Sequence, residues 1–307
     1  MNILITGITG YVGSRVASRL AHDGHDLRGF SRRAASITLS GREVPVVSGD
    51  AVTARGLDQA LEGVDVAYYL MHSLEPSSDG TFSRHERRAA ENFARAAQAA
   101  GTERIIYLGG LAPAGTTTSP HLASRLAVER ILLQAVPCAV ALRASIMIGA
   151  GSRPFRLLVR LVERMPVLPF PAWHANRTSP IDERDMVEVL ARVATADGVC
   201  GCSLDVGGPE EVTYGEFIER IRDLLLVGRP TISFKRVSVT PIVSRVAAVI
   251  AGEEHALIGP LMESLQSDML PRRDDAVRTL GVRLHSLDAA IEHALREWES
   301  TERLAAR

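Results

Sequence analysis

Short apolar runs alternate with amphipathic stretches from the first residues of the chain onward. Residues Asn2 to Thr6 are almost all apolar, as expected of a strand buried on both faces of a sheet. From Tyr11 to about His22 the apolar residues recur every three or four positions, which predicts a helix. The same patterns predict further strands at 27–30, 44–47, 65–71, 104–108 and 139–148, and helices at 54–61, 82–100 and 122–135. This alternation is typical of a doubly wound α/β fold, in which helices cover both faces of a parallel sheet.

The regular alternation loosens after Gly149. The pattern there predicts helices at 153–164, 182–194, 214–225 and from Ser286 toward the end, a strand at 202–206, and a proline-rich loop at 166–171. We therefore expect a Rossmann core and a smaller mixed cap that holds the substrate. The core is expected to contain residues 1–150 with 176–208, and the cap residues 151–175 and 209–307.

Three glycines mark the turn between the first strand and the first helix. The segment from Thr6 to Gly13 reads TGITGYVG. Glycines let backbone amides approach a pyrophosphate closely, and the start of a helix offers free N–H groups and a positive dipole end. At the head of a βαβ series such a loop predicts a dinucleotide cradle. The residues expected to form it are Gly7, Thr9, Gly10, Tyr11, Val12 and Gly13.

The end of the second strand indicates which dinucleotide is preferred. An acidic residue at this place binds the ribose 2′-hydroxyl of NAD, whereas arginine accommodates the 2′-phosphate of NADP. The chain has Ser31, Arg32 and Arg33 there and no acid. A guanidinium can bind the phosphate bidentately, so we expect NADP, with NAD as the alternative.

The ends of the later strands complete the expected cofactor crevice. Asp50 follows the third strand and is predicted either to accept a hydrogen bond from the adenine or to cap the following turn. The other residues expected to line the crevice are Gly49, Ala51, Leu70, Met71, His72 and Gly109.

The spacing of these motifs resembles the extended short-chain dehydrogenase/reductase family, which includes nucleotide-sugar epimerases. The loop TGITGYVG is similar to the family's TGxxGxxG form, and residues 142–149 and 205–210 resemble two of its later strands. Three runs, YYLMHSL, HLASR and RASIMIGAGS, look closest to an atypical, NmrA-like branch of bacterial NAD(P)-binding proteins. The resemblance covers nearly the whole chain and implies NAD(P) binding.

The family's catalytic residues are not found where the resemblance would place them. The family uses a serine or threonine after the fifth strand, and a tyrosine followed four residues later by a lysine. Here Gly109 and Gly110 end the fifth strand, and the helix position reads HLASR from His121 to Arg125. The sole lysine, Lys235, lies far downstream. The usual tyrosine and lysine pair is therefore predicted to be absent.

Two histidines and one arginine are the candidates for a replacement. His121 and Arg125 are four residues apart and share a helix face, so the imidazole can donate a proton near an arginine that binds the nicotinamide ribose or an oxyanion. Arginine itself stays charged and cannot relay protons. His72, at the end of the fourth strand, is a second proton-donor candidate. The alternative for His121 is that it caps the helix, and the alternative for His72 is that it bonds a loop backbone. Trp173 is expected either to line a substrate pocket or to anchor its loop.

Composition bears on nucleic-acid binding, on disulfides and metals, and on membrane contact. The chain of 307 residues has a formal net charge of −1, which argues against a nucleic-acid partner. Its three cysteines, Cys138, Cys200 and Cys202, fit neither a disulfide framework nor a zinc site, so reduced thiols in a cytoplasm and no metal are expected. The apolar stretch at 239–252 is too short to span a bilayer, although contact with a membrane surface stays open.

These expectations together describe an NADP(H)-binding atypical oxidoreductase acting on an unidentified small organic substrate. One alternative is a non-catalytic NAD(P)-sensing protein, which the NmrA-like resemblance implies. Another is an enzyme similar to the nucleotide-sugar epimerases, which the missing tyrosine disfavours. The oligomeric state and any protein partner are left open.

Overall fold

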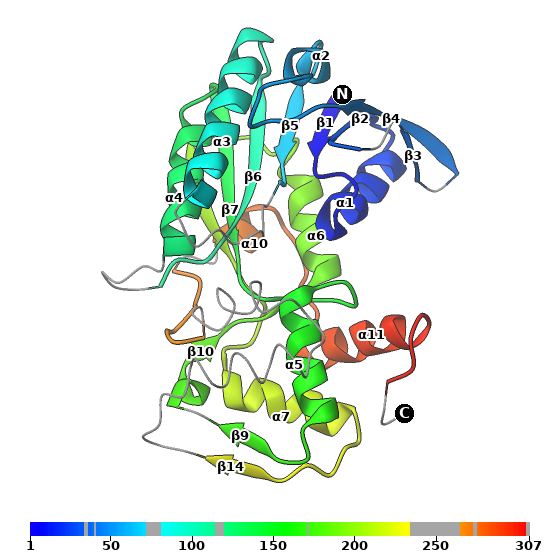
Figure 1. Ribbon diagram of the computed structural model, residues 1–307, viewed down its shortest axis with the longest axis vertical. Helices are drawn as coiled ribbons and strands as arrows, with labels where there is room; N and C mark the ends of the chain where they lie inside the picture. Colours follow the sequence, from blue (N-terminus) through cyan, green and yellow to red (C-terminus); the bar gives the residue numbers. More distant parts are fainter. Residues whose placement is uncertain are drawn as a thin grey trace.

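A computed structural model of the chain describes residues 1–33, 36–39, 41–71, 81–113, 120–170, 172–233, 265–272 and 275–304. Figure 1 shows a large sheet flanked by helices in the upper part of the molecule and a smaller, mainly helical part below it.

The upper part is built on an eight-stranded sheet with the order β12-β7-β6-β5-β1-β2-β4-β3. Its strands are β1 (Asn2–Thr6), β2 (Asp26–Ser31), β3 (Ser36–Leu39), β4 (Arg42–Ser48), β5 (Val66–Tyr69), β6 (Arg104–Gly110), β7 (Cys138–Ala144) and β12 (Cys202–Val206). Every pairing is parallel except that of β3 with β4. The chain reverses direction across the sheet between β1 and β5, so the predicted doubly wound Rossmann fold is confirmed.

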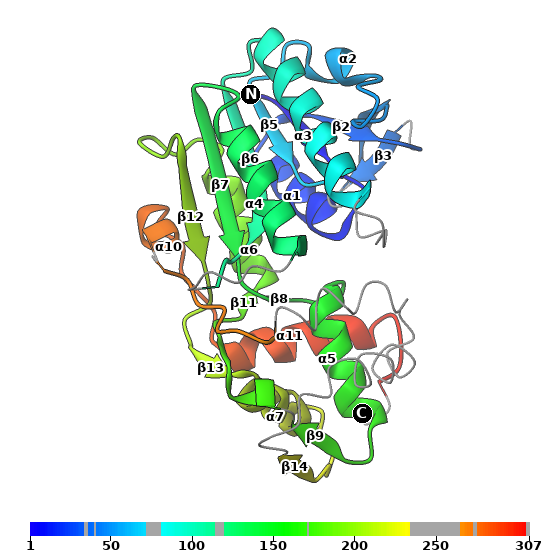
Figure 2. The same ribbon diagram turned by 60° about the vertical axis from the view of Figure 1, so that its left-hand side comes forward.

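Helices cover both faces of this sheet (Figures 1 and 2). Helices α1 (Tyr11–His22) and α6 (Glu183–Arg192), with α10 (Asp275–Thr279), pack on one face, and α2 (Leu57–Leu61), α3 (Thr81–Ala99) and α4 (Pro120–Leu133) on the other. The strands are apolar on both sides: Ile3 and Ile5 face the first set of helices, while Leu4 faces the second. This explains the continuous apolar runs that predicted buried strands.

The lower part has a hydrophobic core of its own. Helices α5 (Arg153–Arg164), α7 (Tyr214–Leu224) and α11 (Leu287–Glu299) enclose Phe155, Phe217 and Trp298, all fully buried. Around them lie η1 (Ala172–Ala175) and the short strands β8 (Met147–Ile148), β9 (Leu168–Phe170), β10 (Arg177–Thr178), β11 (Ile181–Asp182), β13 (Val212–Thr213) and β14 (Thr231–Ser233). The exact division into core and cap stays a prediction.

Three local expectations were wrong. The strand predicted at 139–148 is interrupted, because β8 leaves the large sheet to pair with β11. The loop predicted at 166–171 contains β9, which pairs in parallel with β14. Strand β3 was not predicted, since its four residues depend on antiparallel pairing with β4.

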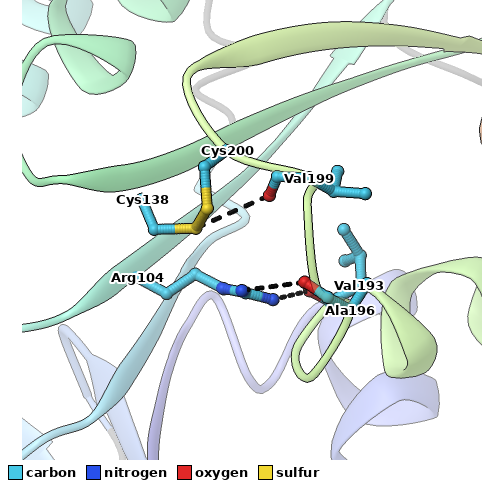
Figure 3. Close-up of a disulfide and its surroundings, with 6 residues drawn as sticks. All are labelled: Arg104, Cys138, Val193, Ala196, Val199 and Cys200. Atoms are coloured by element: carbon cyan, nitrogen blue, oxygen red, sulfur yellow. Dashed lines mark hydrogen bonds between the residues drawn. A yellow bond between two sulfur atoms is a disulfide. The ribbon is translucent and has the colours of Figure 1, made fainter.

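Two of the cysteines are joined, so the prediction of reduced thiols was wrong for them. Cys138 and Cys200 form a disulfide with a Cα–Cα distance of 4.5 Å, while Cys202 is free (Figure 3). The cause is the register of two parallel strands. Cys202 lies opposite Val140, so Cys200, two residues earlier, reaches Cys138 at the start of β7. Disulfides persist in oxidising compartments, so the cytoplasmic location stays a prediction only.

The loop that carries Cys200 is also held by Arg104. The Arg104 guanidinium donates hydrogen bonds to the carbonyl oxygens of Val193 and Ala196, at 2.6 and 2.9 Å (Figure 3). Edge strand β12 is thus fixed to the sheet at its start.

Among the helices of the described residues, none is both long and apolar enough to cross a membrane. The apolar stretch at 239–252 lies outside the described residues.

Candidate cofactor site

The glycine turn after β1 has the shape expected of a phosphate-binding loop. Gly7 has a φ of 68°, a left-handed conformation that favours glycine. The Gly10 amide donates to the Gly7 carbonyl at 2.8 Å, which closes the turn directly before α1. Gly10 is the N-cap of α1, and no side chain of the described residues caps the helix there. The first amides of α1 are therefore available to an anion.

Close packing explains two of the glycines. A Cβ at Gly13 would lie 2.8 Å from the Gly7 carbonyl carbon and closer still to its oxygen. A Cβ at Gly7 would lie 3.0 Å from the carbonyl oxygen of Leu70, at the end of β5. The turn is thus wedged between the start of α1 and the neighbouring strand, at the point where the sheet reverses direction.

The end of β2 presents two exposed arginines. Ser31 is half-buried, and Arg32 and Arg33 extend into solvent after it. Within the part of the chain that the structure describes, neither guanidinium makes an ion pair. Both cations are therefore available to a phosphate, and their binding to one stays a prediction.

The turn after β4 is fixed by its own side chains. Asp50 Oδ1 accepts a hydrogen bond from the Val52 amide at 2.8 Å, so this carboxylate caps the turn, as one of the two predicted roles requires. The Asn92 amide of α3 donates to the carbonyl oxygens of Ala51 and Val52. A Cβ at Gly49 would lie 2.8 Å from Cζ of the Phe30 ring. Contact between Asp50 and adenine stays a prediction.

A buried hydroxyl links β1 to the end of β5. Thr6 Oγ1 donates to the Tyr68 carbonyl oxygen and accepts from the Leu70 amide, both at 3.0 Å. Leu70 is buried and Met71 is half-buried beside this point. His72, the second proton-donor candidate, lies outside the described residues. Gly109, at the end of β6, is half-buried.

Helix α4 carries the candidate catalytic pair one turn apart, as predicted. The His121 side chain lies outside the described residues, so its role is untested. Arg125 is half-buried, and its carbonyl oxygen accepts a hydrogen bond from the Tyr107 hydroxyl of β6. Burial raises the pKa of Glu86 on α3 and of Tyr107, and the positive charge of Arg125 partly opposes this rise. The neighbouring Ser124 donates to Glu86 at 2.7 Å. Ser124 and Arg125 thus take part in packing α4 against its neighbours.

No tyrosine lies on α4, and the chain's five tyrosines are engaged elsewhere. The Tyr68 and Tyr107 hydroxyls donate to the carbonyl oxygens of Leu190 and Arg125, at 2.6 and 3.4 Å. Tyr69 packs edge-on against a phenylalanine ring. Tyr11 bonds a carboxylate, and burial raises the pKa of Tyr214 to about 12. Lys235 lies outside the described residues, so the absence of the usual pair stays a prediction.

Trp173, the residue considered for a substrate pocket, packs against the lower core. The ring of Trp173 packs edge-on against Tyr214, with centroids 6.3 Å apart, which favours the anchoring role. Arg177 is exposed and bonds Asp268, with its Nη2 at 3.0 Å from Oδ2.

One charged cluster was not anticipated. Glu183, His293 and Glu297 place one ligand-type atom each within 4.8 Å of one another, although the first and last are far apart in sequence. Sequence periodicity gives no signal for such long-range contacts. Arg15 lies against both carboxylates, with its Nη2 at 3.5 Å from Glu183 Oε1. A guanidinium therefore supplies the positive charge of this cluster.

The fold and the glycine turn define an NAD(P)-binding Rossmann protein. A family model described as NAD(P)H-binding matches residues 7–144. The chain is 33% identical over 168 residues to a ceramide reductase of Caulobacter vibrioides, a stretch covering 54% of this chain and 53% of that protein. It is 30% identical over 233 residues to the (4-alkanoyl-5-oxo-2,5-dihydrofuran-3-yl)methyl phosphate reductase of Streptomyces griseus, covering 74% of each.

The chain belongs to the short-chain dehydrogenase/reductase superfamily. The match spans only about half the length of the ceramide reductase. Among solved structures, that of gox2253 has a TM-score of 0.76 at 23% identity and covers 97% of both chains, which confirms the fold.

Proposed function

We propose that this chain is an NADP(H)-dependent reductase of a small organic carbonyl compound. The observation that carries the proposal is the uncapped start of α1 behind a closed glycine turn, with two exposed arginines at the end of β2. The two relatives described above are both reductases by name, which supports reduction as the direction.

In this proposal the chain binds and orients while the cofactor carries the chemistry. Bound NADPH supplies the hydride, and the reduced oxygen requires a proton. The α1 amides bind the pyrophosphate, and Arg32 and Arg33 bind the 2′-phosphate. His121 is the proposed proton donor, because an imidazole titrates near neutral pH and α4 carries no tyrosine.

Arg32→Ser and Arg33→Ser are each expected to weaken NADPH binding by about tenfold to a hundredfold, while NADH binding stays unchanged. A hydrogen bond to a charged group contributes about 1.5–3 kcal/mol, and about 1.4 kcal/mol equals tenfold in affinity. Fluorescence titration of both cofactors measures this. The control is Arg42→Ser. Arg42 is exposed and begins β4, whereas Arg32 and Arg33 lie beside the other end of that strand, where Ser31 pairs with Ser48. Equal losses for NADPH and NADH would contradict the NADP preference.

His121→Ala is expected to lower kcat for NADPH oxidation by about a hundredfold or more, the usual contribution of a positioned general acid. The assay follows NADPH absorbance against a panel of ketones and quinones. His22→Ala, an exposed histidine at the end of α1, is the matched control and should keep its rate. If no compound in the panel oxidises NADPH, the reductase proposal fails.

A cofactor-sensing protein is the second candidate. It is favoured by helix α4, which has no tyrosine or lysine and whose Ser124 and Arg125 take part in packing. A sensor must bind oxidised and reduced cofactor with different affinities, since a ligand shifts an equilibrium only through differential binding. Equal affinities for NADP⁺ and NADPH, measured by fluorescence titration of the same protein, would exclude this function.

A further inference from the structure

Tyr11, the first residue of α1, contacts residues that are more than 130 positions later in the sequence. The Tyr11 hydroxyl donates to Oε2 of Glu183, the first residue of α6. The Tyr11 ring lies against Gly149 and Gly151, and a Cβ at Gly151 would come within 2.6 Å of its Cε2. Tyr11 directly follows Gly10 of the phosphate-binding turn, so these contacts fix the turn as well.

Glu183 in turn contacts a second carboxylate. Its side chain is only 6% exposed and lies beside Glu297 of α11. Burial, followed by the negative charge of Glu297, raises the pKa of Glu183 to about 8. Burial of Glu297 opposes its ionisation, but bonds to Arg15 outweigh this and lower the pKa of Glu297. At neutral pH the pair therefore holds one proton, on Glu183.

That proton has a clear acceptor. Glu297 Oε2 is buried, and among the described protein atoms it has no donor of its own. A protonated Glu183 donates to Glu297 while its Oε2 still accepts from Tyr11. Tyr11, Glu183 and Glu297 then form one chain of hydrogen bonds across α1, α6 and α11.

We propose that protonated Glu183 is a positioning residue that fastens the phosphate-binding turn to α11, so that cofactor binding weakens when this proton is lost. The proposal rests on the proposed cofactor site. Figure 1 shows α11 below α1 and α6, at the junction of the upper and lower parts. A single proton at this junction therefore links the cofactor turn to the part of the molecule that holds the lower core.

Other charged and titratable groups lie around Glu183 on the three helices. Helix α1 contributes Tyr11 and the cation Arg15. Helix α6 contributes Arg184, which is bonded to Asp182, and Glu188, which pairs with Arg19 and Arg192. Helix α11 contributes His293 beside Glu297.

The sign of the stability effect follows from the two states. The unfolded chain loses the Glu183 proton near pH 4.5, whereas the folded chain keeps it to about pH 8. The unfolded state therefore binds fewer protons between these values, and stability falls across that window and levels off above it. Glutamine keeps both hydrogen bonds without titrating, so Glu183→Gln should show no such fall.

The test is titration of NADP binding between pH 7 and pH 9. We expect the wild-type affinity to fall about tenfold with a midpoint near pH 8, since one proton changes a binding constant by at most about tenfold per pH unit. Glu183→Gln should bind with wild-type affinity at pH 7 and show no fall. Glu183→Ala should bind weakly at both pH values. Glu188→Gln, on the same helix, is the control and should keep the wild-type midpoint.

The outcomes separate the two proposals. A wild-type protein that binds no NADP at pH 7 overturns the proposed function. A wild-type protein that binds with the same affinity at both pH values overturns the role of Glu183 alone. So does a Glu183→Gln variant that keeps the wild-type pH profile. Thermal unfolding of the same variants gives a readout without cofactor: the advantage of Glu183→Gln over wild type should be larger at pH 8 than at pH 5.

Discussion

Gly13→Ala is expected to weaken NADP binding by tenfold or more and to lower the free energy of unfolding by about 1 kcal/mol. Alanine is the better helix former by about 1 kcal/mol, which taken alone would stabilise α1. The added Cβ, however, would lie 2.8 Å from the Gly7 carbonyl carbon, which is backbone and cannot turn away. Forcing atoms into a packed site costs about 1–3 kcal/mol, and α1 must shift to relieve the overlap.

The shift of α1 is what reduces cofactor binding. Its first amides would move away from the phosphate position, and each hydrogen bond to a charged group contributes about 1.5–3 kcal/mol. Fluorescence titration and urea unfolding measure the two effects. Gly228→Ala is the control, because a Cβ there meets no atom of the described residues within 4 Å. Unchanged NADP affinity in Gly13→Ala would place the cofactor elsewhere.

Cys200→Ser is expected to lower the free energy of unfolding by about 2–4 kcal/mol. The disulfide to Cys138 closes a loop with a sequence separation of 62 residues. The chain-entropy model gives about 4 kcal/mol for such a loop, as an upper value. The bond also holds edge strand β12 to β7, so its loss should expose that edge first.

Urea unfolding with and without a thiol reductant measures this effect. Reduction of the wild type should reproduce the variant, while Cys200→Ser should not respond to reductant. Cys202→Ser removes the free, half-buried thiol and serves as the control, with little change expected. Equal stability of reduced and oxidised wild type would show that the disulfide does not form.

Elements defined by local pattern were predictable from the sequence. Strand β1, the glycine turn and α1 follow from apolar spacing and from the conformations that glycine allows. The strand β3 was missed because only its pairing with β4 defines it. The disulfide was missed for the same reason, because it depends on the pairing register between β7 and β12.

The candidate site was predictable to the same degree. Its glycines and arginines lie at strand ends, and parallel strands bring their ends to one edge of the sheet. The contacts of Glu183 with Tyr11 and with Glu297 were not predictable, since they join three helices that are distant in the chain. Periodicity reports which face of a helix is buried, but not which other helix covers it.

The Thr6 hydroxyl extends the hydrogen bonding between β1 and the end of β5. The paired residues of β1 and β5 end at Thr6 and Tyr69. Thr6 Oγ1 continues the bonding one residue further, because it accepts from the Leu70 amide and donates to the Tyr68 carbonyl. A side-chain oxygen of β1 thus takes the place of a backbone carbonyl as the partner of the Leu70 amide. The buried Leu70 amide is therefore paired although it lies beyond the last residue of β5.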